Sequence, residues 1–139
     1  MRFVFRGWCF CESSVSNLVK DFDYVLDLGK LSPGTAGTDD IEALVEECSA
    51  LREPPLPPDE FRKTLKQKKF TSQKADEEMV ADLYEMTFKR DMGAATKLNY
   101  AQLRWGDEEM SVLSRTVAIG ALGTLVQLDL GRNRIGEEG

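Results

Sequence analysis

The sequence predicts an α/β chain that is mainly helical, and two patterns support this. Apolar residues recur at helical spacing through residues 38–96, as they do on the buried faces of amphipathic helices. A strand–turn–helix pattern then begins near residue 97 and starts again 30 residues later, which is typical of a repeat array. We therefore expect three parts: residues 1–37 as the remnant of an upstream α/β domain, 38–96 as a helical connector, and 97–139 as the start of a repeat array.

The N-terminal part combines one helix pattern with one strand pattern. Val15, Leu18 and Val19 have the spacing of a single apolar stripe on a helix. The segment "YVLDLGKL", residues 24–31, alternates apolar and polar residues and predicts a short strand. Residues 32–37 are rich in glycine, serine and proline, and we expect them to form a loop.

The connector begins with a predicted helix over residues 39–51, capped by Thr38 or Asp39. The proline-rich "PPLPP", residues 54–58, must end this helix, because proline has no N–H donor and disfavours helix in the residue before it. We expect an extended spacer; a ligand for a proline-recognising domain is the alternative. Pro58 is suited to the first position of the next helix.

A long helix is predicted after residue 72, and Tyr84 and Phe88 are four residues apart, so their rings should meet. We expect the apolar faces of the connector helices to pack together as one core. The predicted core residues are Ile41, Leu44, Val45, Cys48, Phe61, Leu65, Met79, Val80, Leu83 and Met86.

The C-terminal part contains two related segments, "LNYAQLRWGDEE" from residue 98 and "LDLGRNRIGEEG" from residue 128. At the offset of 30, leucine aligns with leucine, arginine with arginine, and glycine with glycine. The second copy resembles the leucine-rich repeat of the ribonuclease-inhibitor type, Leu-x-Leu-x-x-Asn-x-Ile-Gly-x-x-Gly. The motif residues are Leu98, Trp105, Gly106, Leu125, Leu128, Leu130, Asn133, Ile135, Gly136 and Gly139.

This resemblance implies a solenoid in which strand leucines point inward, the asparagine bonds backbone groups of the turn, and the glycines permit a tight bend. The first copy departs from the motif, with Tyr100 in place of a strand leucine and Leu103 in place of the asparagine. We interpret it as an atypical capping repeat; a chance match to a single strand–turn hairpin is the alternative. The helix that should cover Leu128 and Leu130 would follow Gly139, so we expect the chain to be a fragment.

The segment "RGWCFCE", Arg6 to Glu12, resembles the stretch in which Toll/interleukin-receptor-like domains carry a catalytic glutamate. It is also similar to an Arg-x-Trp-x-x-x-Glu stretch of fungal heterokaryon-incompatibility domains. The resemblance implies that Glu12 is the acid of an NAD-cleaving site, with Trp8 and Cys9 beside it. The alternative is a glutamate in the first turn of a helix, where the helix dipole favours it.

Composition and missing motifs exclude several function classes. The chain has no histidine, which removes Ser-His-Asp and Cys-His catalysis and histidine-ligated metals. Neither phosphate-binding glycine motif occurs, so we expect no cofactor. Cys9, Cys11 and Cys48 could hold zinc only with a borrowed fourth ligand, and packing is the alternative. The net charge of −6 argues against nucleic acid, and the basic run in residues 62–69 fits a solvated helix end.

These observations together predict a non-catalytic protein–protein interaction module. The longest apolar run, residues 117–123, is too short to span a membrane. An odd number of cysteines suggests reduced thiols, and we therefore expect a cytoplasmic protein with an unidentified protein partner. The order of the three parts is similar to that of large leucine-rich repeat proteins of unicellular algae and other protists. The alternative function is the remnant of a Toll-like NAD-cleaving or signalling domain fused to repeats.

Overall fold

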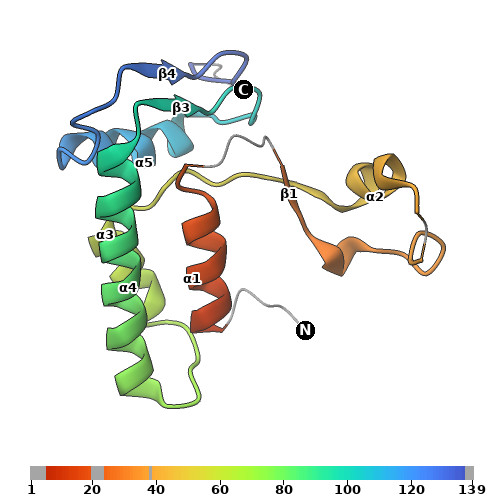
Figure 1. Cartoon of the computed structure of the whole chain (residues 1–139), viewed down its shortest axis with the longest axis horizontal. Coiled ribbons are helices and arrows are strands. Elements are labelled where there is room, and N and C mark those ends of the chain that lie inside the picture. The colour runs from red at the N-terminus through yellow and green to blue at the C-terminus, as the bar shows by residue number, and fades with distance from the viewer. Residues whose placement is uncertain (1–5, 20–23, 38, 137–139) are drawn as a thin grey trace.

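The computed structural model describes residues 6–19, 24–37 and 39–136, and it is an α/β fold in which helices predominate. Figure 1 shows α1, α3 and α4 together in one body, with α5 and the pair β3–β4 at one end of it. The strands β1 and β2 and helix α2 belong to an arm that extends away from this body (Figure 1). The elements are α1 (Gly7–Ser16), β1 (Tyr24–Leu26), the 3-10 helix η2 (Leu28–Lys30), α2 (Ile41–Cys48), β2 (Ser49–Leu51), α3 (Pro58–Leu65), α4 (Gln73–Ala94), β3 (Lys97–Asn99), α5 (Asp107–Ala118) and β4 (Gln127–Asp129).

A column of aromatic rings forms the centre of the body. Phe10 of α1 stacks on Phe61 of α3 with ring centroids 5.0 Å apart, and Phe61 stacks on Tyr84 of α4 at 3.8 Å. The rings of Tyr84 and Phe88 are 6.0 Å apart, which confirms the contact predicted from their spacing. Burial of large aromatic side chains provides much of the free energy that holds such a core together.

The predicted face of α4 was wrong for three of its residues. Met79, Leu83 and Met86 are 57%, 40% and 60% exposed, whereas Val80 is fully buried. The buried face instead follows a four-residue spacing from Val80 through the two aromatic residues to Met92. This face is the longer of two apolar stripes on α4, and it carries the aromatic rings, so more apolar area is removed from water when it turns inward.

Helix α2 does not join the core of the body. Ile41 is 75% exposed, because α2 packs on η2 in the arm rather than on α4. Its N-cap is Asp40, whose carboxylate accepts hydrogen bonds from the backbone N–H groups of Glu42 and Ala43. The sequence predicted Thr38 or Asp39 in this role; Thr38 lies outside the described residues. Where a strand was expected over residues 24–31, the chain forms β1, paired antiparallel with β2, and then η2.

The proline-rich segment, residues 52–57, runs as an extended strap across the body, and its prolines are buried. Its carbonyl oxygens accept bonds from buried side chains of α4, of α5 and of the loop that precedes α5. As predicted, Pro58 then begins α3. The bonds to the strap, each 2.8 Å long, run from Trp105 Nε1 to Arg52 O, from Thr116 Oγ1 to Pro55 O and from Tyr84 Oη to Leu56 O.

A buried polar cluster joins α1 to the C-terminal part. Tyr100 Oη donates to the carbonyl oxygen of Leu18 at 2.7 Å, and Arg52 donates to the carbonyl oxygen of Asn17 at 2.9 Å. The Arg52 guanidinium also lies 5.0 Å from the centroid of the Tyr100 ring. Burial raises the pKa of Tyr100 to about 12, although the cationic Arg52 acts in the opposite direction. The N-terminal helix, the strap and the C-terminal part therefore share one core.

Candidate functional site

The strands β3 and β4 pair in parallel, and their register reproduces the offset seen in the sequence. Leu98 lies opposite Leu128, 30 residues later. Beyond the strands, Gln102 N donates to Gly131 O at 2.9 Å and Arg134 N donates to Trp105 O at 2.8 Å. The two segments aligned by the sequence pattern therefore lie side by side from end to end. A strand–turn–helix pattern that repeats requires its strands to pair in parallel, and β3 and β4 do so.

The two segments also share local backbone geometry. The Asn99 side-chain oxygen accepts a bond from Ala101 N at 3.0 Å, and Asp129 accepts one from Gly131 N at 2.9 Å. Each strand thus ends in the same side-chain-to-backbone turn. Three residues beyond Asn99 and Asp129, the backbone takes the left-handed conformation in both copies, with φ near 60° at Gln102 and 56° at Arg132. These matches mean that residues 97–106 and 127–136 are two copies of one strand–turn unit.

Asn133 connects the two units with its side chain. Its Oδ1 accepts bonds from the N–H groups of Leu103 and Trp105, at 3.0 and 3.1 Å. Its Nδ2 donates to the carbonyl oxygens of Tyr100 and Leu130, at 2.7 and 2.9 Å. One amide therefore satisfies two donors and two acceptors of turn backbone, which is the role that the sequence pattern predicted for it.

The remaining motif residues differ in how deeply they lie. Leu98 and Trp105 are buried, and Leu125 and Leu130 pack against the edge of the core. Leu128 and Ile135 are 37% and 44% exposed, so the expectation that strand leucines all point into a core is wrong for Leu128. The core cluster reaches Leu98 but not Leu128, and among the described residues no helix follows β4 to cover it.

The motif glycines lie at the two bends. Gly106 precedes α5, and its N–H donates to the side chain of Glu109 at 2.8 Å. Gly136 has φ of 72°, a conformation that favours glycine, and its N–H donates to Asp107 Oδ1 at 2.9 Å. Asp107 was not among the predicted motif residues, although it lies 29 positions before its partner. Gly139 lies outside the described residues.

One side of the β3–β4 pair presents polar side chains. Successive residues of a strand point to opposite faces, and on β3 Leu98 is buried between two exposed neighbours. In the parallel register, Lys97 is opposite Gln127 and Asn99 is opposite Asp129, and all four are exposed. We call these four residues the strand face.

Glu12 is exposed on α1 and lies in the middle of that helix. It is not in the first turn, so the dipole argument for a structural role does not apply to it. Gly7 is buried with its α-carbon against the Phe70 ring, where a Cβ atom would come within 1.8 Å of the ring. Trp8 is 42% exposed. The structure thus explains the glycine of this segment by close packing.

The three cysteines are free thiols, and Cys11 and Cys48 are buried. Burial raises the pKa of Cys11 to about 11, and the neighbouring Glu12 carboxylate adds to the effect. A thiol with such a pKa stays protonated at neutral pH, so it packs as a small apolar group. No group of three or more Cys, Asp or Glu side chains is placed to hold a metal ion in the part of the chain that the structure describes.

Comparison with protein families, with curated proteins and with solved structures found no match. Across residues 6–19, 24–37 and 39–136, no helix combines the length and the apolar character that crossing a membrane requires. The inference of function therefore depends on the paired units and on the surface that they present.

Proposed function

We propose that the chain is a non-catalytic protein–protein interaction module, and that residues 97–136 are two successive units of a leucine-rich repeat array. In this proposal the strand face binds a protein partner. The helical body holds that face in place through the strap and the core.

The observation that supports the proposal best is the joining of the two units by Asn133. Its four hydrogen bonds, with the parallel register of Leu98 and Leu128, fix the two strands relative to each other. A surface that is already ordered loses little conformational entropy when a partner binds. None of the four strand-face side chains is buried in the core. Asn99 and Asp129 each use one oxygen in the turn of their own strand, and their other polar atoms remain available to a partner.

The composition of the strand face suggests how it would bind. The strand face offers one cation, one anion and two neutral amides, namely Lys97, Asp129, Asn99 and Gln127. Neighbouring side chains are spaced by the strand separation of about 4.8 Å. The partly exposed Leu128 lies on the opposite face of the strand pair, so contacts at the strand face are polar.

Site-specific photocrosslinking tests the proposal. A photoreactive residue is placed at Gln127 in the full chain, and at Glu42 of the arm, which is also exposed, as the control. In cells of the source organism, we expect a discrete crosslinked protein with the probe at position 127 and none at 42. The crosslink should disappear when Lys97 and Asp129 are exchanged for residues of opposite charge. Equal crosslinking from both positions, or from neither, contradicts the proposal.

A further inference from the structure

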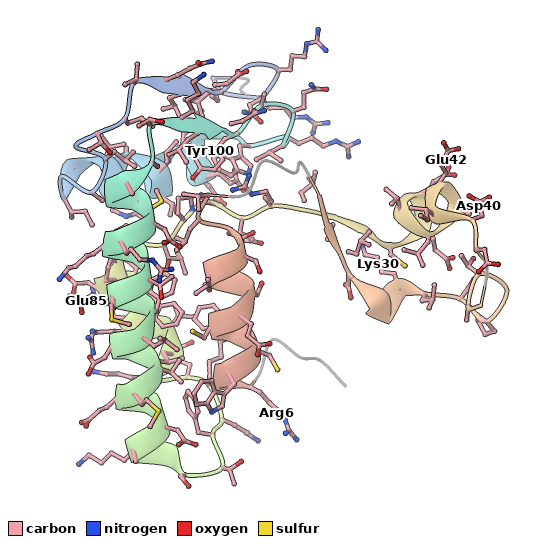
Figure 2. The ribbon with its side chains drawn as sticks, viewed as in Figure 1. Arg6, Lys30, Asp40, Glu42, Glu85 and Tyr100 are labelled. Atoms are coloured by element: carbon pink, nitrogen blue, oxygen red, sulfur yellow. The ribbon has the colours of Figure 1, made fainter. Side chains whose placement is uncertain are left out.

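Helix α4 has a second apolar stripe that faces away from the core. Met79, Leu83 and Met86 follow one another at the four- and three-residue spacings of a helix face, and all three are exposed. Glu85, labelled in Figure 2, is on the side of α4 that faces away from α1. Methionine side chains adapt readily to a facing surface. An exposed stripe of this kind is typical of a helix that packs against another helix.

Two opposite charges continue this stripe at equal distances from its centre. Asp76 lies seven residues before Leu83, and Arg90 lies seven residues after it. Seven residues are two helical turns, or about 10.5 Å along the axis. Both charges therefore lie on the same side of α4 as Leu83. Asp76 is partly exposed and accepts a bond from the Ser72 N–H at 3.3 Å, and Arg90 is exposed.

We propose that a second copy of this chain binds the stripe, with the two α4 helices antiparallel and crossing at Leu83. In this arrangement Leu83 contacts Leu83 of the other copy, and Met79 contacts Met86. Asp76 of each copy is level with Arg90 of the other, so that two equivalent ion pairs form across the twofold axis. A self-complementary surface of this kind is what a twofold-symmetric dimer requires.

The charges closest to the crossing point are compatible with the pairing. Asp82 precedes Leu83, so the Asp82 carboxylates of the two copies approach each other near the twofold axis. Each is already bonded to Arg62 of its own chain at 2.7 Å, and Arg62 also binds Glu85 at 2.7 Å. Arg90 pairs in its own chain with Asp91, but the Arg90 side chain is 69% exposed, and an ion pair of an exposed side chain is exchanged for another at little cost.

Three apolar side chains from each copy make a small interface. Interfaces below about 1,200 Å² of total buried surface belong to weak or transient complexes. We therefore expect a monomer–dimer equilibrium that depends on protein concentration. This inference does not depend on the strand face or on the proposed repeat array.

Sedimentation equilibrium of the full chain over a wide concentration range tests the dimer. Leu83→Glu places like charges at the twofold axis and should weaken dimerisation by about tenfold or more. Asp76→Arg and Arg90→Asp should each weaken it by about fivefold, because both symmetric ion pairs are lost. The double exchange should restore the original dissociation constant, since it recreates both pairs with reversed polarity.

Val126→Glu is the matched control, because Val126 is 85% exposed next to β4, outside α4. It should leave dimerisation unchanged. Circular dichroism establishes that each variant keeps its helices. A chain that stays monomeric at all concentrations overturns the proposal. So does a dimer that tolerates Leu83→Glu, or one for which the double charge exchange gives no recovery.

Discussion

The indole nitrogen of Trp105 donates a 2.8 Å hydrogen bond to the carbonyl oxygen of Arg52. Trp105 closes the first strand–turn unit, and Arg52 begins the strap, so this bond attaches the repeat-like part to the helical body. Trp105 is 2% exposed. Both ends of the bond are therefore shielded from water, and the loss of either one leaves the other unsatisfied.

Trp105→Phe should lower the free energy of unfolding by about 1–3 kcal/mol, because the Arg52 carbonyl loses its donor while most of the ring is retained. Urea denaturation followed by circular dichroism measures this change. Trp8→Phe is the control, since Trp8 is 42% exposed, and it should have little effect. Equal effects of the two substitutions would contradict the role of the buried bond.

Asn133→Ala should separate the two strand–turn units. It leaves the N–H groups of Leu103 and Trp105 without their acceptor, and we expect a loss of about 1–3 kcal/mol. Hydrogen exchange of these two amides should become faster. Asn99→Ala is the control, because the side chain of Asn99 accepts its bond from the Ala101 N–H within its own turn and does not join the two units. Unchanged protection of both amides in Asn133→Ala would refute the bridging role.

Phe88→Ala and Leu83→Ala should distinguish the two faces of α4. Phe88 is 1% exposed, and its truncation should cost about 3–5 kcal/mol. Leu83 is 40% exposed, and its truncation should cost less than about 1 kcal/mol. Thermal melts at low protein concentration, where α4 is unpaired, give both values. The reverse order would mean that α4 packs through the face predicted from sequence.

Glu85 forms two ion pairs, one with Arg62 and one with Lys89. We expect them to make the free energy of unfolding depend on pH in the acid range. Hydrogen bonds from Lys89 and, to a lesser extent, from Arg62 lower the pKa of Glu85 to about 2, from its ordinary value of 4.5. A lowered pKa stabilises the fold above the unfolded-state pKa, and this contribution is lost as the pH falls from about 4.5 towards 2. Glu85→Gln should flatten that part of the stability profile. An identical profile for both proteins would show that the ion pairs contribute nothing.

The chain should not cleave NAD, because Glu12 lies on an exposed helix face and the sequence contains neither phosphate-binding glycine motif. Incubation of the purified chain with NAD, followed by measurement of nicotinamide, checks this. The chain and its Glu12→Ala variant should both match the rate without protein. Turnover that disappears in Glu12→Ala would instead support the hydrolase alternative.

The sequence predicted those features that depend on spacing along the chain, either within one helix or between the two repeated segments. The offset of 30 residues predicted the pairing of Leu98 with Leu128, and the four-residue spacing predicted the contact between Tyr84 and Phe88. The face of α4 could not be predicted in this way. That helix has two apolar stripes, and the choice between them depends on Phe10 and Phe61, which come from distant helices.

The strap was beyond sequence-based prediction for a different reason. Its contacts use carbonyl oxygens, which every residue possesses, so the residue types in the segment carry no signal for them. The sequence pattern predicted only that residues 54–58 are extended. It could not predict that Tyr84, Trp105 and Thr116 would all donate to this segment.

The ends of the arm lie close together, because Arg52 donates to the carbonyl oxygen of Asn17 at 2.9 Å. The chain therefore leaves the body and returns to it at nearly the same place. A segment whose two ends lie this close together can be shortened, replaced or extended without a change in the contacts of the body. Evolution and protein engineering can both exploit such a location: the arm is the natural point for grafting a foreign domain, or for replacement by a short glycine-rich link.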